Sequence, residues 1–88
     1  MVQNESDLQI CYAEYFVGNS KVRAWLWAVR AGLDIRYEIE LEQAGERQRC
    51  EVGARARQAR ELFLRVVWGG VSLCTLTDIV EDTSGTLF

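Results

Sequence analysis

The run from Leu33 to Glu42 alternates apolar and charged residues at every position, and it restricts the fold of this chain more than any other feature. Strict alternation places one kind of side chain on each face of a β-strand. A turn signal at Gly45 follows, and the polar positions then resume at Arg47 and Arg49. The pattern predicts a β-hairpin with one buried face.

The hairpin has a definite register if Ala44 and Gly45 form the tip of its turn. The predicted facing pairs are Glu42 with Arg47, Glu40 with Arg49, Ile39 with Cys50 and Tyr37 with Val52, and Glu38 with Glu51 is the one like-charge pair. Opposite-charge and apolar pairs each contribute roughly 0.2–1 kcal/mol. A slip by one residue would turn the apolar set to solvent, so the register is strongly specified. The three glutamates are therefore interpreted as scaffold.

The size and composition of the chain indicate one folded domain. Its 88 residues are 49% hydrophobic and 26% charged, which is typical of a globular protein, and a chain of this length buries about 60–65% of its unfolded surface. We expect a flexible tail over residues 1–7, a single domain over residues 8–83 and a flexible C-terminus over residues 84–88.

Two segments before the hairpin fit either a helix or a strand. Leu8 to Val17 has apolar residues at helical spacing but an aromatic content that suits a strand, and Lys21 to Ala31 shows the same conflict. Turn signals recur about every 13 residues, as in an antiparallel meander. This spacing favours strands for both segments.

The period changes after the hairpin. The positions with helical spacing are Ala56, Ala59, Phe63, Val66 and Val67, with Leu62 at the edge of the stripe. They predict an amphipathic helix near residues 55–68 that Gly69 and Gly70 end. Val71 to Leu76 is expected to be a short strand or an extended loop, and Asp78 to Val80 a final helical turn. The predicted fold class is α+β: an antiparallel meander of three to four strands packed on one C-terminal helix.

The absence of histidine lowers the expectation of an enzyme. The sequence contains no His, which removes the commonest general base and metal ligand. We therefore predict no catalytic residue, no cofactor and no metal site. Cys11, Cys50 and Cys74 lie far apart and are expected to be reduced thiols in a cytoplasmic protein, with Cys50 buried on the apolar side of the hairpin. No stretch is long and apolar enough to predict a membrane span.

The outer face of the predicted helix is its least ordinary feature. Leu64 and Trp68 project on the same side as Arg57, opposite the apolar stripe, and Trp and Arg are enriched in binding hot spots. One interpretation is contact with a protein partner or a second copy through Arg57, Arg60, Leu64 and Trp68. The other is that Trp68 folds back over the loop from Gly69 to Leu73.

Two further functions remain open. Arg55, Arg57, Arg60 and Arg65 could bind nucleic acid, although a net charge of −3 argues against it. Cys11 and Cys74 could serve a thioredoxin-like thiol protein, which needs an activated thiol. The hypothesis we adopt is a non-enzymatic interaction or regulatory module.

The second half of the chain resembles a family of short uncharacterised bacterial proteins, a domain of unknown function found mainly in Gram-positive anaerobes. The residues that carry the resemblance are Tyr37 to Leu41, Ala59 to Val67 and Val71 to Asp82. The family pattern has Gly where Glu38 stands and Pro where Leu73 stands. The resemblance implies a small regulatory or interaction role and brings no catalytic residue or ligand with it.

A weaker resemblance connects Ser20 to Glu42 with the first helix and second strand of glutaredoxin-like and glutathione-transferase-like thioredoxin folds. Gly70 to Gly85 is faintly similar to their closing helix. Those families place a cis-proline before a later strand, and this chain contains no proline. The resemblance implies thiol or glutathione chemistry, which the missing proline argues against.

Overall fold

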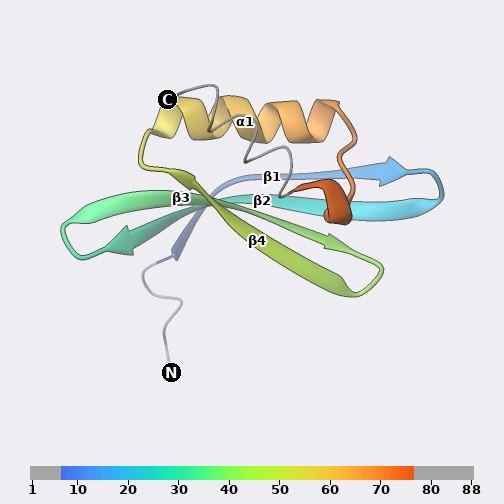
Figure 1. The fold of residues 1–88 in the computed structure, drawn as a ribbon, viewed down its shortest axis with the longest axis horizontal. Coiled ribbons are helices and arrows are strands. Elements are labelled where there is room, and N and C mark those ends of the chain that lie inside the picture. The colour runs from blue at the N-terminus through green and yellow to red at the C-terminus, as the bar shows by residue number, and fades with distance from the viewer. Residues whose placement is uncertain (1–6, 77–88) are drawn as a thin grey trace.

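The computed structural model describes residues 7–76 and has an α+β fold with one sheet and one long helix (Figure 1). Four antiparallel strands lie in the order β1-β2-β3-β4, and α1 covers one face of the sheet. The elements are β1 (Asp7–Val17), β2 (Ser20–Ala31), β3 (Asp34–Gln43), β4 (Glu46–Gly53), α1 (Ala56–Trp68) and a short 3-10 helix, η2 (Leu73–Thr75). The predicted fold class is confirmed.

Both ambiguous segments are strands, as the turn spacing favoured. In β2, Val22, Ala24 and Leu26 are buried beneath α1, while Trp25 and Trp27 alternate with them and lie on the opposite face. In β1 the half-buried and exposed positions likewise alternate from Cys11 to Val17, and a bulge at Ile10 interrupts the pairing with β2. Asp7, which was predicted to belong to a flexible tail, begins β1, and residues 1–6 lie outside the described residues.

The hairpin of β3 and β4 has the predicted register over most of its length. Glu42 with Arg47, Glu40 with Arg49, Ile39 with Cys50 and Glu38 with Glu51 are observed partners. The pair Tyr37 with Val52 is wrong, because a bulge makes Tyr37 the partner of Gly53 instead. Gly53 has a φ of 103°, a value that glycine adopts without the steric cost of a side chain. Val52 is the extra residue and packs against the core.

The turn of this hairpin is formed by Ala44 and Gly45. Their φ angles are 55° and 83°, and positive φ at both central residues is the property of the type I′ turn that matches the twist of two-residue hairpins. Glycine tolerates this conformation and alanine does not do so readily. The turn therefore contains one favourable and one strained residue.

The helix α1 buries its apolar stripe on β2 and β3. Its buried residues are Ala59, Leu62, Phe63 and Val66. Leu62, expected at the edge, belongs fully to the core, whereas Ala56 is exposed because it lies in the first turn, beyond the region of closest packing. Together with Val22, Ala24, Leu26, Ile39, Leu41, Val71 and Leu76 these four residues form a single hydrophobic core.

The helix ends in a hydrogen-bonded capping motif. The backbone N–H of Gly70 donates to the carbonyl of Val67 and that of Val71 donates to the carbonyl of Val66, both at 3.2 Å. Gly70 has a φ of 62°, as the Schellman motif requires. The apolar contact of that motif also exists, because Val66 and Val71 are both buried. The predicted termination at the two glycines is confirmed.

The sequence predicted a short strand or an extended loop after the two glycines. The structure has a short helix there instead. Leu73–Thr75 forms η2, and Leu76 is fully buried. Two hydrogen bonds hold the segment to the sheet: Tyr15 Oη donates to the carbonyl of Val71 at 2.7 Å, and the N–H of Leu73 donates to Gln43 Oε1 at 2.9 Å. The helical turn expected over Asp78 to Val80 lies outside the described residues, as do residues 84–88.

Candidate interaction surface

The outer face of α1 carries all four residues predicted to bind a partner. Arg57, Leu64 and Trp68 follow one another on successive turns together with Glu61, and Arg60 flanks them. Trp68 is 84% exposed and Leu64 is 45% exposed, although both are large apolar residues. Because the opposite side of the helix faces the core, these residues form a surface that nothing in residues 7–76 covers. We call it the α1 outer face.

The interpretation in which Trp68 folds back over the loop from Gly69 to Leu73 is wrong. The capping motif turns the chain down towards the sheet immediately after the helix, and Val71 then occupies the space beneath Val66. Val71 is buried at the end of the core, whereas Trp68 stays 84% exposed, so its ring does not pack on the loop. Its exposure follows from the backbone geometry of the cap.

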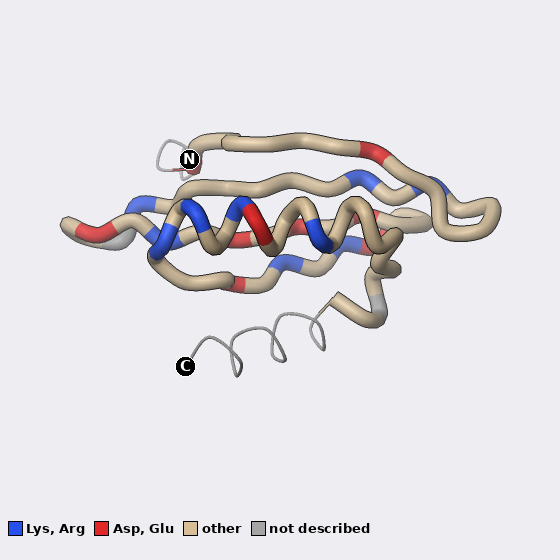
Figure 2. Tube along the Cα trace, turned by 90° about the horizontal axis from the view of Figure 1, so that it is seen from above, with Lys and Arg blue, Asp and Glu red and all other residues tan. Residues whose placement is uncertain are grey.

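The helix is strongly cationic (Figure 2). The charged residues from its N-cap to its last turn are Arg55, Arg57, Arg60, Glu61 and Arg65. Among the described residues the ion pair on this helix joins Arg57 and Glu61, whose Nε and Oε2 atoms lie 4.0 Å apart. Both side chains are largely in solvent, where such a pair contributes little. Within residues 7–76 the α1 outer face therefore combines an excess of positive charge with two exposed apolar side chains.

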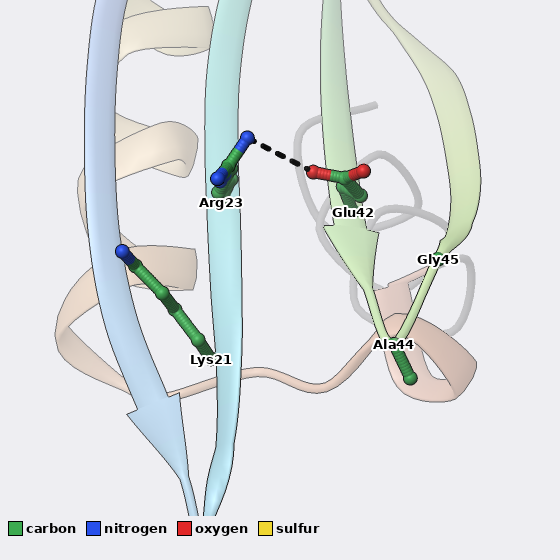
Figure 3. A pocket seen from close by; sticks show the side chains of 5 residues that line it. All are labelled: Lys21, Arg23, Glu42, Ala44 and Gly45. Carbon is green, nitrogen blue, oxygen red and sulfur yellow. Dashed lines mark ion pairs between the residues drawn. The ribbon is translucent and has the colours of Figure 1, made fainter.

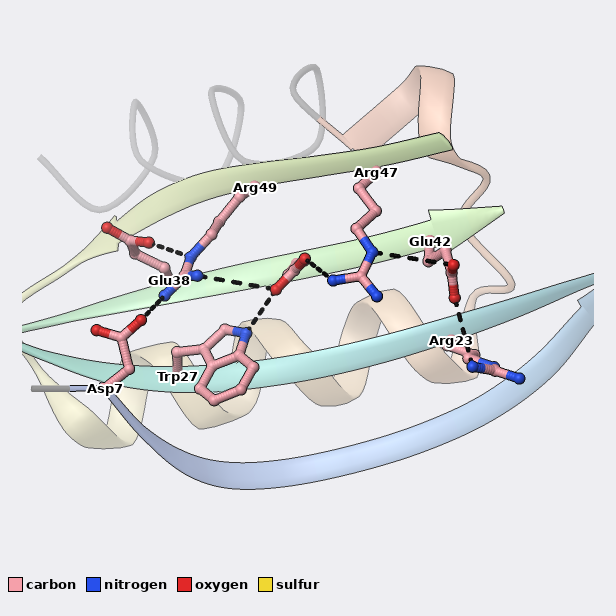
Figure 4. A network of polar contacts seen from close by, with 8 residues as sticks. Asp7, Arg23, Trp27, Glu38, Glu42, Arg47 and Arg49 are labelled. Atoms are coloured by element: carbon pink, nitrogen blue, oxygen red, sulfur yellow. Dashed lines mark hydrogen bonds and ion pairs between the residues drawn. The ribbon is translucent and has the colours of Figure 1, made fainter. Parts of the chain in front are cut away.

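The opposite, open face of the sheet carries a network of charged and aromatic residues (Figure 4). Glu40 lies at its centre and is only 7% exposed. Trp27 Nε1 donates to Glu40 Oε1 at 2.8 Å, and Arg47 Nη1 donates to Glu40 Oε2 at 3.1 Å. Both carboxylate oxygens are thus satisfied, so the burial of this charge is compensated.

The shortest ion pairs of the network run diagonally between β3 and β4. Arg47 lies closer to Glu40, at 3.1 Å, than to its facing partner Glu42, at 3.9 Å. Arg49 bonds to Glu38, whereas its facing partner Glu40 is 3.8 Å away. The two facing pairs were correctly predicted as neighbours, but strand twist brings the charged ends closer to the next residue along. All these glutamates are held by the scaffold, as the sequence indicated.

Residues from other strands complete the network, and the sequence did not point to them. Asp7 on β1 accepts a hydrogen bond from Arg49 at 3.0 Å, and Arg23 on β2 lies 3.6 Å from Glu42. The guanidinium groups of Arg47 and Arg49 lie over the rings of Trp25 and Trp27, at 5.3 and 5.2 Å from the ring centres. These contacts could not be predicted, because they depend on how β1, β2 and β3 pair, and no local sequence pattern specifies that pairing.

Two shallow pockets open on this face. One of about 520 Å³ is lined by Asp7, Gln9, Trp27, Glu40, Arg47 and Arg49. The other, of about 210 Å³, lies beside the β3–β4 turn and is lined by Lys21, Arg23, Glu42, Ala44 and Gly45 (Figure 3). Every charged side chain in both pockets takes part in an ion pair of the open face. Neither pocket thus presents a free charge to a ligand.

Groups suited to metal or thiol chemistry are not brought together in residues 7–76. This part of the chain contains no cluster of three or more His, Cys, Asp or Glu side chains that could hold a metal ion. Cys11 and Cys50 form no disulfide within the described residues and are half-buried against the core, so Cys50 is less deeply buried than predicted. The segment compared with the first helix of thioredoxin-like folds is strand β2. Cys74 lies in the backbone of η2.

Comparison with known proteins found no similar protein. No family model, no curated protein and no solved structure matches this chain. None of the helices within the described residues has the length and apolar character needed to cross a bilayer. The geometry of the surfaces is therefore the basis for inferring a function.

Proposed function

We propose that this chain is a small, non-enzymatic protein-interaction module that binds an acidic partner protein through the α1 outer face. The observation that carries the proposal is the exposure of Trp68, 84%, next to Leu64 on a helix with three arginines and one glutamate and a fourth arginine at its N-cap. A large apolar side chain held outside the core by the backbone, and flanked by Arg, has the composition of a binding hot spot.

The charge of the surface supports an acidic partner. The α1 outer face is positive although the whole chain has a net charge of −3, and complementary charge speeds association and selects partners. Within residues 7–76, the charges of the pockets on the open face of the sheet are paired with one another, so those pockets offer an acidic partner no unpaired positive charge. The partner expected here has an apolar pocket for Trp68 and Leu64 with carboxylates at the rim that meet Arg57 and Arg60.

The proposal includes a reducing, cytoplasmic setting and no catalysis. It is supported by the absence of histidine from the sequence and by two half-buried cysteines, Cys11 and Cys50, that form no disulfide within residues 7–76. The resemblance of the second half of the chain to a family of short uncharacterised bacterial proteins, which brings no catalytic residue with it, belongs to the same proposal.

The test compares the wild-type chain with the double variant Leu64→Ser, Trp68→Ser. A photoreactive group on the α1 outer face identifies the partner, which is then purified and titrated against each form. We expect the double variant to bind at least about 30-fold more weakly, since a hot-spot residue contributes 2 kcal/mol or more. Leu33→Ser is the matched control, because Leu33 is fully exposed in the β2–β3 turn, and it should bind like wild type.

Two outcomes would overturn the proposal. One is a partner whose affinity is the same for the wild-type chain and the double variant. The other is binding of labelled RNA or DNA that weakens steeply with salt and depends on Arg55, Arg57, Arg60 and Arg65 but not on Trp68. The second outcome would replace the protein partner with a nucleic acid.

A further inference from the structure

The strand β1 forms an edge of the sheet that is open to pairing. It has 11 residues and, within residues 7–76, pairs only with β2. Alternate N–H and C=O groups of an edge strand point away from the sheet, so a long regular edge is a template for another strand. From Cys11 to Val17 the pairing with β2 is continuous, and the only bulge lies nearer the N-terminus, at Ile10.

The two edges of the sheet differ in how they are protected. Half of the eight residues of β4 are charged, namely Glu46, Arg47, Arg49 and Glu51, and charged side chains discourage a further strand from pairing. β1 has only two charged residues, and both are compensated within the chain. Asp7 lies 3.0 Å from Arg49, and Glu14 lies 2.9 Å from Lys21. Charge therefore protects β4 and leaves β1 available.

The side chains of β1 also leave apolar surface uncovered. Phe16 is 66% exposed and Tyr12 is 43% exposed, with the Tyr12 ring centre 5.5 Å from that of Trp25. Taking about 200 Å² for a fully exposed ring, these two residues leave roughly 200 Å² uncovered in each copy. Stable, specific interfaces bury about 1,200 Å² or more of surface, counted over both partners. The rings, Leu8 and the strand edges of two copies offer less apolar area than this, so we expect a weak, concentration-dependent dimer.

We propose that β1 pairs with β1 of a second copy of this chain, antiparallel about a two-fold axis at Ala13, to form a continuous eight-stranded sheet. An isologous contact requires a self-complementary segment, and this register provides one. It places Tyr12 opposite Glu14 of the second copy and Cys11 opposite Tyr15 of the second copy, all within the segment after the bulge. An axis at Glu14 would instead bring two carboxylates face to face, which is destabilising.

This proposal is independent of the binding proposed for α1. The helix covers one face of the sheet (Figure 1). Tyr12 and Phe16 alternate with residues of β1 that pack against the core, so they lie on the other face, and both contacts can exist in one assembly. A dimer would present two copies of the α1 outer face and could bind a multivalent partner more tightly than one copy does.

Sedimentation equilibrium of the full chain tests the dimer. Dimerisation follows mass action, so between about 5 and about 200 μM the mass should rise from one chain towards two. Each chain has a mass of 10.1 kDa. Hydrogen exchange at the two concentrations should show added protection of β1 amides and none in β4, which serves as the internal control.

The variant Phe16→Glu should weaken the dimer at least about 10-fold, because a charge on an edge strand opposes pairing. The new carboxylate would face Lys21 within its own sheet, so folding should be preserved, and circular dichroism confirms this. Leu33→Ser and the double variant Leu64→Ser, Trp68→Ser should dimerise like wild type, which separates this proposal from the one for α1.

Three results would overturn the proposal. They are a single-chain mass at about 200 μM, where a weak dimer should be populated, a dimer that protects β4 or α1 instead of β1, and a dimer that Phe16→Glu does not weaken. Protection of β1 that appears only when another protein is added would assign this edge to an extended segment of that protein instead of a second copy.

Discussion

Replacing Tyr15 by Phe should destabilise the fold at neutral pH by removing the hydrogen bond that ties the segment after α1 to β1. The phenol Oη donates to the carbonyl of Val71 at 2.7 Å, and Val71 is itself buried. Loss of the donor leaves a buried carbonyl without that partner, which costs about 1–3 kcal/mol. Because Tyr15 is only half-buried, water can partly replace the bond, and we expect a loss of about 1–2 kcal/mol at pH 8.

The pH dependence of this effect gives a sharper test. Burial raises the pKa of Tyr15 from its ordinary value near 10 to about 12. The folded state therefore favours the neutral phenol, so its contribution to stability is complete below pH 10 and is lost as the pH rises through 12. A two-unit shift corresponds to at most about 3 kcal/mol, and solvent screening of a half-buried group reduces this to about 1–2 kcal/mol.

Urea unfolding followed by tryptophan fluorescence measures both effects. The wild-type protein should lose stability between pH 10 and pH 12, while Tyr15→Phe lacks this part of the loss, so the two unfolding free energies should converge at the alkaline end. Tyr37→Phe removes a hydroxyl from β3 and keeps Tyr15, so it should follow the wild-type pH dependence. A difference between wild type and Tyr15→Phe that stays constant across the range, or is absent at pH 8, would refute the reasoning.

Three further substitutions probe the scaffold. Glu40→Ala leaves the Trp27 indole N–H without its acceptor and should lower the free energy of unfolding by about 1–3 kcal/mol. Urea unfolding measures this loss, and the Trp27 emission serves as a local probe. If neither the free energy nor the emission changes, the role given to Glu40 is wrong. Phe63→Ala opens a cavity under α1 and should cost about 3–5 kcal/mol, a large part of the stability of so small a domain, seen as a fall in the thermal midpoint. Ala44→Asn places a residue suited to positive φ in the type I′ turn and should stabilise the hairpin by about 0.5–1 kcal/mol, whereas a lower urea midpoint would show that the turn is not strained at Ala44.

The elements that the sequence predicted correctly are those specified by near neighbours. The period-two alternation of Leu33 to Glu42 identified β3, and the helical stripe with its two glycines identified α1 and its end. The hairpin register also followed, because a two-residue turn with facing charges leaves little freedom. Its error at Tyr37 arose because a bulge depends on local backbone strain and on core packing of Val52, which alternation does not encode.

The interaction surface was predictable in part for a similar reason. The positions of Arg57, Leu64 and Trp68 on one side of a helix follow from the helical repeat alone. The orientation of the Trp68 ring does not, because it depends on whether Trp68 or Val71 closes the end of the core. The capping bonds from Gly70 and Val71 decided this in favour of Val71.

The sequence by itself determined the hairpin, the helix and the faces of both, because these depend on contacts between residues two to about ten positions apart. Only the tertiary structure decided that residues 7–17 and 20–31 are strands, since their apolar spacing suits either state and the outcome depends on burial beneath α1. It also brought Asp7, Trp27 and Glu40 into one network and left β1 as an open edge. The network and the open edge depend on contacts between segments distant in the chain. These contacts stabilise the fold only once the whole sheet has formed, so no local pattern predicts them.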